Sequence, residues 1–166
     1  MIEGLEFYER KRLKDERGFF MELWKDDQTI PHTFKQDNIS HSKFGTLRGL
    51  HFQKESMAQG KLVSVISGVV WDVVVDLRID SKTYGEWYGI TLSELNDTVM
   101  YVPPGFAHGF LTLSPYAIFH YKCTEVYSKE HEDSIVWDDP TLAIDWPIEP
   151  LFVSEKDAGA KRLDQL

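Results

Sequence analysis

Histidine, lysine and arginine side chains suited to acid–base chemistry lie close together in the sequence between residues 48 and 61 of this 166-residue chain. His51 follows the apolar-rich segment Gly45-Thr46-Leu47, with Arg48 just before it and Lys61 a short distance after it, and His108 lies in a second strand-like stretch. Histidine is the side chain whose ordinary pKa lies nearest neutrality, so two of them can serve as acid and base. A single histidine in a strand more often has a structural role. The presence of Arg48, Lys61 and His108 in the same region favours a catalytic role for His51.

The same histidines raise the question of a metal site. Pro103-x-Gly105-x-x-His108 resembles the second motif of the cupin superfamily, in which the histidine points into a barrel. The first cupin motif would supply two histidines, but here it reads His51-Phe52-Gln53. A catalytic first-row metal usually needs three imidazole, thiolate or carboxylate ligands, and a neutral amide is a poor substitute. We therefore expect no metal.

A tyrosine in a third strand-like stretch could supply a second proton donor. Residues an even number apart on a strand share a face, which groups Ala117, Phe119, Tyr121, Cys123, Glu125 and Tyr127. Such a stripe is more often core than active site. A buried hydroxyl nevertheless needs a partner, and a polar cavity would supply one. Tyr121 is therefore a candidate general acid, with Tyr127 or Phe20 as stacking platforms for a planar base.

Four cationic side chains are candidates for binding an anion: Arg17, Arg48, Lys61 and Lys156. A solvated surface role is the simpler interpretation of any one of them. Arg48 and Lys61 lie in strand-like contexts, however, where an inward charge is costly unless paired. A diphosphate would be a suitable partner. The net charge of −9 argues against non-specific nucleic-acid binding but leaves a small anionic ligand possible.

Short strands separated by turn residues predict an all-β antiparallel sandwich or barrel. The expected strands are 61–67, 69–78, 86–92, 98–102, 106–113 and 117–127. Short helices are expected near 22–30 and 154–165. The proline-containing tail from Trp137 onward is expected to wrap over the barrel, which could lay Asp157 against its interior.

Length and composition set further expectations. A chain of 166 residues predicts one domain, 1–166. Its 42% hydrophobic and 27% charged residues are typical of a globular protein. The single cysteine, Cys123, cannot form an internal disulfide. No secretory signal or membrane-spanning run is visible, so a cytoplasmic protein is the default expectation.

Sequence blocks along nearly the whole chain resemble the dTDP-4-dehydrorhamnose 3,5-epimerase family. The matching blocks are Asp15-Glu16-Arg17-Gly18-Phe19-Phe20-x-Glu22, Gln36-Asp37-Asn38-x-Ser40, Gly45-x-Leu47-Arg48-Gly49-Leu50-His51-Phe52-Gln53, Gln59-Gly60-Lys61-Leu62-Val63, Val75-Asp76-Leu77-Arg78, Pro103-Pro104-Gly105-Phe106-Ala107-His108-Gly109-Phe110, Tyr121-Lys122, Tyr127, Asp139-Pro140, Ile144-x-Trp146-Pro147 and Ser154-x-Lys156-Asp157-Ala158. They occur in the family's order.

The resemblance implies a homodimeric cupin jelly-roll barrel with a few short peripheral helices and no metal or organic cofactor. It implies that His51 is the base, Asp157 its orienting carboxylate, Tyr121 the acid and Lys61 the stabiliser of an enolate oxygen. The residues that would contact the substrate are Arg17, Phe20, Glu22, Gln36, Asp37, Asn38, Arg48, His108, Tyr127, Glu132 and Lys156.

The reaction implied by the resemblance is inversion of C3 and C5 of dTDP-4-dehydro-6-deoxy-D-glucose to give dTDP-4-dehydro-L-rhamnose. Epimerisation at C3 or C5 alone, and action on a related dTDP- or GDP-linked 4-ketosugar, remain open because such relatives share these motifs. Two other classes are a metal-dependent cupin oxygenase, which Gln53 disfavours, and a non-catalytic sugar-nucleotide-binding module.

Overall fold

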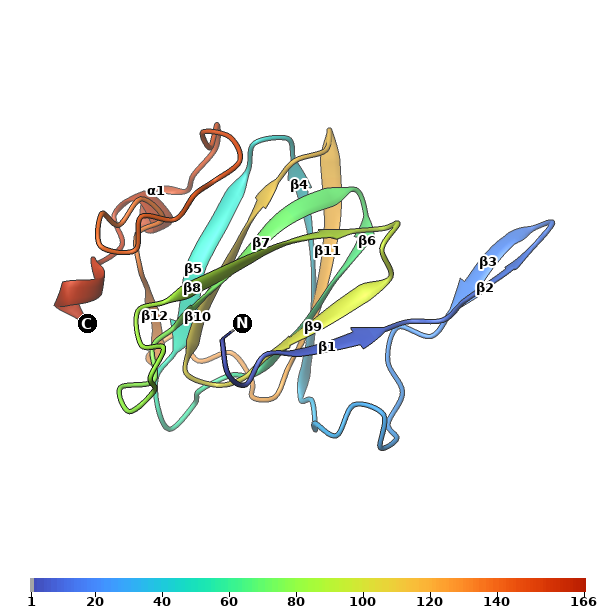
Figure 1. Ribbon diagram of the computed structural model, residues 1–166, viewed down its shortest axis with the longest axis horizontal. Helices are drawn as coiled ribbons and strands as arrows, with labels where there is room; N and C mark the ends of the chain where they lie inside the picture. The colour runs from blue at the N-terminus through green and yellow to red at the C-terminus, as the bar shows by residue number, and fades with distance from the viewer. Residues whose placement is uncertain (1) are drawn as a thin grey trace.

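The computed structural model describes residues 2–166, which form two antiparallel sheets packed face to face (Figure 1). In spatial order the first sheet contains β1 (Glu6–Glu9), β9 (Thr98–Val102), β6 (Lys61–Ser67), β11 (Tyr116–Cys123) and β4 (Gln36–Lys43). The second contains β12 (Glu132–Ser134), β5 (Leu47–Gln53), β10 (Phe106–Thr112), β7 (Val69–Asp76) and β8 (Trp87–Ser93). This arrangement confirms the predicted all-β antiparallel class.

Strand β7 shows how the apolar runs build the core. Val70 and Val74 pack in the main core between the sheets, whereas Val73 and Val75 pack on the opposite face, beneath the C-terminal tail. Both faces are covered, which explains why this strand is a nearly continuous apolar run. The tail contributes buried Leu142 to the second cluster, so it does wrap over the sandwich.

The predicted strands agree with the structure at most of their ends, with two corrections. The strand predicted over 69–78 ends at Asp76, and the one predicted over 117–127 ends at Cys123. Cys123 pairs with the first residues of both neighbouring strands, so the chain beyond it has no strand to pair with. Tyr127 therefore does not share a strand face with Tyr121.

Of the two expected helical segments, only the C-terminal one contains helix. The expectation of a helix over 22–30 is wrong: the segment is irregular and lays Trp24 and Ile30 against Leu62 and the neighbouring side chains of the first sheet. The expectation over 154–165 is confirmed in part, by the one-turn helix α1 (Glu155–Ala158) and the 3-10 helix η1 (Leu163–Gln165). No helix within residues 2–166 is long and apolar enough to cross a membrane.

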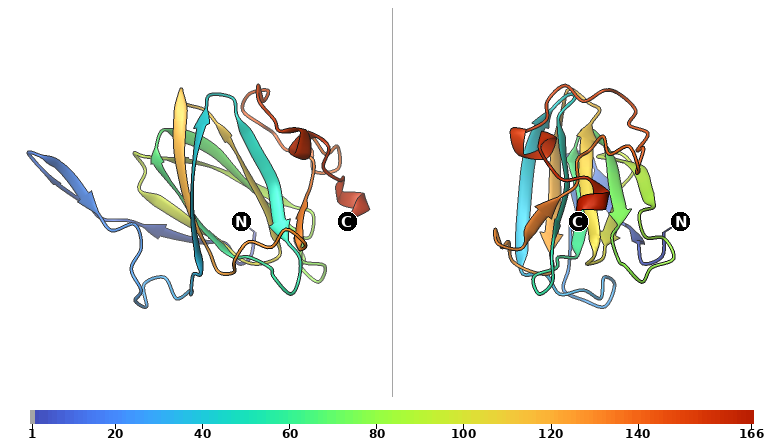
Figure 2. Two further views of the ribbon diagram at one scale, coloured as in Figure 1. Left: turned by 180° about the vertical axis from the view of Figure 1, so that it is seen from behind. Right: turned by 90° about the vertical axis from the view of Figure 1, so that its left-hand side faces the viewer.

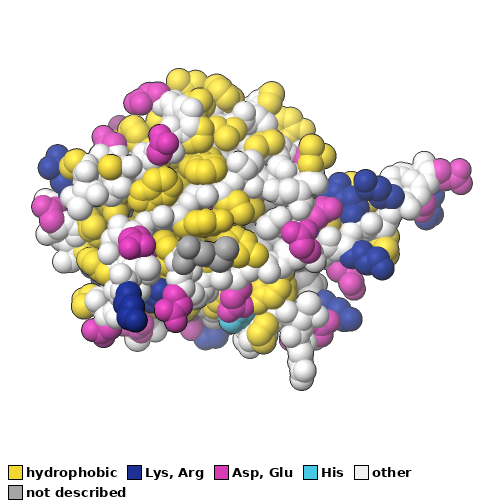
Figure 3. Space-filling view, viewed as in Figure 1, with side chains coloured by type: hydrophobic (Ala, Val, Ile, Leu, Met, Phe, Trp, Pro, Cys, Tyr) yellow, Lys and Arg dark blue, Asp and Glu magenta, His cyan; other side chains and the backbone are white. Residues whose placement is uncertain are grey.

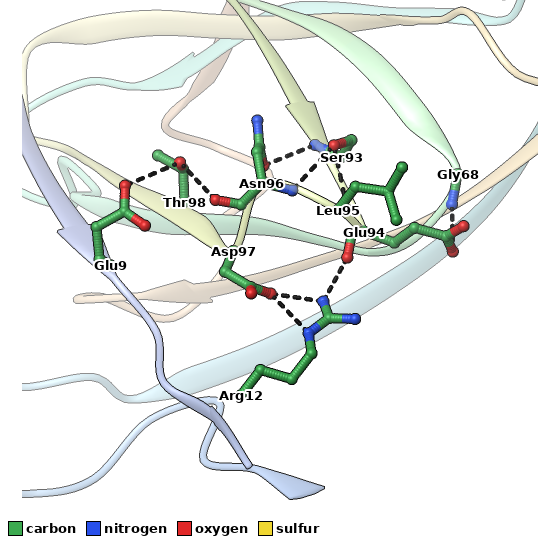
Figure 4. A network of polar contacts seen from close by, with 9 residues as sticks. All are labelled: Glu9, Arg12, Gly68, Ser93, Glu94, Leu95, Asn96, Asp97 and Thr98. Atoms are coloured by element: carbon green, nitrogen blue, oxygen red, sulfur yellow. Dashed lines mark hydrogen bonds and ion pairs between the residues drawn. The ribbon is translucent and has the colours of Figure 1, made fainter. Parts of the chain in front are cut away.

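A β-hairpin made of β2 (Arg12–Asp15) and β3 (Gly18–Met21) projects from the sandwich. Figures 1 and 2 show it extending away from the body, at the opposite end from the C-terminus. Arg12 fixes its base through Asp97, at 2.5 Å, and the backbone carbonyl of Glu94 (Figure 4). Charged side chains are prominent on this arm in Figure 3, yet Phe20 is 65% exposed.

Candidate active site

A cavity of about 640 Å³ opens between the two sheets, with walls contributed by both sheets and the C-terminal tail. A smaller cavity of about 130 Å³ shares His51, Lys61 and Tyr121 with it. The larger volume is within the range of about 300–1,000 Å³ common for small-molecule sites. Three of the four residues expected to react thus meet where the two cavities join.

His51 lies on β5 and is paired with the carboxylate of Asp157 from α1. His51 Nε2 and Asp157 Oδ1 are 2.7 Å apart, and Asp157 is only 4% exposed. Burial alone would raise the pKa of Asp157, but the hydrogen bond and charge of His51, with smaller contributions from backbone and Ser154 donors, lower it. The carboxylate is therefore ionised and holds His51, which leaves Nδ1 of the ring to exchange a proton.

Gly49 binds Asp157 through its backbone and lets β5 lie close to β10. Its backbone N–H donates to Asp157 Oδ2 at 3.3 Å. The glycine has φ +127°, and a Cβ at this position would lie 2.5 Å from the Cα of Gly109 on β10. Only glycine fits both constraints, because other residues rarely adopt this φ and would collide with the neighbouring strand.

Lys61 lies on β6 with only 8% of its surface exposed. Its Nζ donates to the backbone carbonyl of His51 at 3.1 Å, and within residues 2–166 it forms no ion pair. Burial lowers its pKa because the charged form is desolvated. An ammonium held in this way would gain from a negative charge that develops in the cavity.

Tyr121 faces the cavity from the sheet opposite His51. It belongs to β11, in the first sheet, whereas His51 belongs to β5, in the second. Burial raises the pKa of Tyr121, so its hydroxyl is protonated at neutral pH. A planar or ring-shaped ligand between the sheets would have the imidazole on one side and the phenol on the other.

His108 lies beside His51 but has a different environment. The two histidines are directly opposite in the β5–β10 register, and His108 Nε2 lies 3.0 Å from both carboxylate oxygens of Asp72. Asp72 is fully buried, and burial raises its pKa. Asp72 is not among the site residues predicted from the sequence. Its position within the apolar run of β7 was the available signal, because a buried carboxylate requires a partner.

The structure brings seven of the residues expected to contact a substrate to the cavity walls: Gln36, Asn38, Arg48, His108, Tyr127, Glu132 and Lys156. The expectation for Asp37 does not hold in this structure. Asp37 points to the outer face of the first sheet, where it pairs with Lys122 and lies 2.8 Å from His120. Adjacent strand residues face opposite sides, so Asn38 and Asp37 cannot both face the cavity.

Three further expected substrate contacts, Arg17, Phe20 and Glu22, lie away from the cavity. Arg17 and Phe20 are on the projecting hairpin, and Glu22 is in the segment that follows it. None of the three lines either cavity described above. If they contact a substrate, that substrate must be bound to another copy of the chain.

Gln53 uses its amide for structure. Its Nε2 donates to the carbonyls of Met57 and Val126, at 2.6 and 3.2 Å, and its Oε1 accepts from the backbone N–H of Ser128 at 2.7 Å. The amide therefore holds the loops near the smaller cavity. In the part of the chain that the structure describes, no three His, Cys, Asp or Glu side chains are grouped to hold a metal ion.

A family model and the curated relatives similar to this chain carry the same family description. Residues 1–165 match the family model described as dTDP-4-dehydrorhamnose 3,5-epimerase. The enzyme of that name from Salmonella typhimurium is 50% identical over 95% of this chain and 89% of its own.

Two solved structures are also similar. The Legionella pneumophila dTDP-6-deoxy-D-glucose-3,5-epimerase, in complex with dTDP-4-keto-L-rhamnose, has a TM-score of 0.92, is 49% identical, and the match covers 98% of this chain and 89% of that one. ChmJ from Streptomyces bikiniensis, a 3'-monoepimerase in complex with dTDP-quinovose, has a TM-score of 0.91 at 34% identity over 98% of this chain and 85% of that one. The fold is accordingly the cupin-like jelly roll, and the chain belongs to the dTDP-4-dehydrorhamnose 3,5-epimerase family.

Proposed function

We propose that this chain is an isomerase that inverts C3 and C5 of dTDP-4-dehydro-6-deoxy-D-glucose and yields dTDP-4-dehydro-L-rhamnose, in dTDP-rhamnose biosynthesis. The observation that carries the proposal is the placement of His51 and Tyr121 on facing sheets, with Lys61 lining both cavities and its ammonium bonded to the His51 carbonyl. Family membership supports the same activity.

The chemistry requires a base, an acid and a cation. The C4 keto group makes the hydrogens at C3 and C5 acidic, because the electron pair left behind is delocalised onto the C4 oxygen as an enolate. His51 takes the proton from carbon, and ionised Asp157 stabilises the imidazolium that forms. Lys61 stabilises the oxyanion, and Tyr121 returns a proton to the opposite face of the ring. Each inversion exchanges one C–H bond for another, so no cofactor is consumed.

The rest of the cavity fits the nucleotide diphosphate. Arg48 and Lys156 line the larger cavity and supply positive charge, and Tyr127 at the smaller cavity offers an aromatic face for the base. Arginine binds phosphate through a planar fork and lysine as a point charge. We assign diphosphate contacts to Arg48 and Lys156, base stacking to Tyr127, and polar substrate contacts to Gln36 and Asn38.

The hairpin supports a homodimer as part of this proposal. Its exposed aromatic residue Phe20 and its tip residue Arg17 lie away from the cavity of their own chain. An exposed, projecting pair of strands is suited to pairing with a second copy. Arg17, Phe20 and Glu22 would then complete the cavity of the partner subunit. A chain that sediments as a monomer at micromolar concentration and is fully active would contradict this assignment.

Epimerisation at C3 alone is the alternative, because a 3'-monoepimerase has the same fold. The test is to incubate the purified chain with dTDP-4-dehydro-6-deoxy-D-glucose and to follow the sugar ring by NMR. We expect signals of the product inverted at both carbons. Product inverted only at C3 would support the alternative, and no conversion by a folded chain would contradict the epimerase proposal. Pre-treatment with a chelator should leave the rate unchanged.

A further inference from the structure

Three side chains form a polar chain at the wall between the two cavities. The hydroxyl of Tyr127 donates to Oε2 of Glu132 at 2.9 Å, and Nζ of Lys156 reaches the same oxygen at 2.6 Å. They come from the segment after β11, from β12 and from α1. The Glu132 side chain is 18% exposed and that of Lys156 55%, so a largely buried carboxylate holds a lysine that solvent can reach.

The charge of Glu132 acts on the proposed reacting groups. Burial opposes ionisation, but the hydrogen bonds from Lys156 and Tyr127, and the charges of Lys156 and His51, lower the pKa of Glu132. Its negative charge in turn contributes to raising the pKa of Tyr121, after burial and Cys123. The ionised carboxylate of Glu132 therefore lies beside the position proposed for the diphosphate. The two negative charges repel each other.

We propose that Glu132 competes with the diphosphate for Lys156. In the empty site Lys156 forms an ion pair with Glu132, and when the nucleotide binds Lys156 leaves Glu132 and pairs with the diphosphate. The inference rests on the proposed function, in which Lys156 contacts the diphosphate. A carboxylate and a phosphate offer an ammonium the same kind of oxygen acceptor, so the exchange replaces one charge-assisted hydrogen bond by another. The family resemblance implies only that Glu132 contacts the substrate.

The exchange has a consequence for the base. Once Lys156 has turned to the diphosphate, the charge of Glu132 is no longer neutralised by it and acts more strongly on His51. A nearby negative charge favours imidazolium, the form that His51 takes after it abstracts a proton. Glu132 is thus a positioning residue, acting through Lys156 on binding and through its charge on His51.

The experiment measures dTDP affinity by calorimetry for the wild type, Glu132→Gln, Lys156→Met and the double variant. Glutamine fills the space of glutamate without its charge, and thermal unfolding verifies that each variant is folded. We expect Glu132→Gln to tighten dTDP binding by about threefold to tenfold, because the competing ion pair is lost. Lys156→Met should weaken binding, and Glu132→Gln should tighten binding less in the Lys156→Met background than in the wild type, because only the relief of charge repulsion remains.

Asp133→Asn is the matched control. Asp133 is the next residue on β12 and loses the same charge, but it pairs with Lys54 and Lys161 and lines neither cavity. Its substitution should leave dTDP affinity unchanged. Glu132→Gln should also move the acidic limb of the pH profile of kcat to lower pH, because the His51 imidazolium loses a favourable neighbour.

Weaker dTDP binding by Glu132→Gln, or equal tightening in both backgrounds, would overturn the proposed exchange. An unmoved pH profile would overturn its consequence for His51. These outcomes are distinct from failure of the proposed function. That failure would appear as a wild type that does not bind dTDP, or as a Lys156→Met variant whose affinity equals that of the wild type.

Discussion

Two histidine–aspartate pairs lie side by side in this barrel, and their surroundings differ. In the pair of His51 and Asp157 the imidazole side chain is 32% exposed, and several further donors lower the pKa of the carboxylate. In the pair of His108 and Asp72 the side chains are 7% and 0% exposed, and burial raises the pKa of the carboxylate. The same residue types therefore give an ionised orienting pair at the cavity junction and a more deeply buried pair beside it.

Access and hydrogen bonding, more than residue type, therefore decide which pair can exchange protons with a substrate. His51 has one ring nitrogen bound and one available. Asp157 is stabilised as an anion by the N–H of Gly49 as well as by the imidazole. Asp72 lacks comparable stabilisation and is better suited to holding His108 in one orientation.

The largest expected effect is that of His51→Ala. We expect the epimerisation rate to fall by at least about 10²-fold and up to about 10⁴-fold, the contribution of a general base. dTDP affinity should change little. His108→Ala should reduce the rate less. A steady-state assay of the two variants makes this comparison, and a larger loss for His108→Ala would assign the base to the wrong pair.

Removal of the cation near the developing oxyanion should have the next largest effect. Lys61→Met keeps much of the buried stem but removes the ammonium, and we expect kcat to fall by about 10²–10³-fold. Single-turnover kinetics with saturating ketosugar should locate the loss in the chemical step. An unchanged kcat with a raised KM would show that Lys61 serves binding alone.

Substitution of the two aspartates should lower kcat to extents that differ by about tenfold or more. Asp157→Asn preserves the shape but removes the charge that stabilises imidazolium, so we expect kcat to fall by about 10²-fold. Asp72→Asn should cost about tenfold or less, because this pair does not exchange a proton with the substrate. Comparable losses in kcat would mean that both pairs take part in proton transfer.

Much of this site follows from the sequence, and the exceptions have physical causes. The prediction that the tail carries Asp157 to the barrel is confirmed, because prolines and weak periodicity mark a segment that packs on an existing core. The side of the sheet on which Asp37 lies could not be predicted. Strand β4 reads QDNISHSK, and polar residues occur on both of its faces, so no hydrophobic alternation shows which face is buried. The partner of His108 also depends on the pairing of β7 with β10, which sequence spacing does not specify.

The smallest expected effects concern stability in acid, where the two aspartates act with opposite sign. The folded-state pKa of Asp157 is below its unfolded value, so its contribution is present above about pH 4 and is lost as the pH falls through the folded pKa. The folded-state pKa of Asp72 is raised, so its contribution is present below about pH 4 and is lost as the pH rises through the folded pKa.

Asp157→Asn should therefore lose less stability than the wild type between about pH 5 and pH 3, and Asp72→Asn should lose more. The differences should be on the order of 1 kcal/mol for each unit of pKa shift. Urea unfolding of the wild type and the two variants across this range measures them. The opposite ordering would contradict the assigned charge states.

We infer that His51 and Tyr121 act on the two faces of one ketosugar, at two carbons. The decisive measurement is to incubate the enzyme with dTDP-4-dehydro-6-deoxy-D-glucose in deuterated water and to record the NMR spectrum of the ring as turnover proceeds. We expect deuterium to enter at both C3 and C5, and His51→Ala to abolish incorporation at both. Deuterium at only one carbon, or at neither, with the folded wild type would be the contrary result.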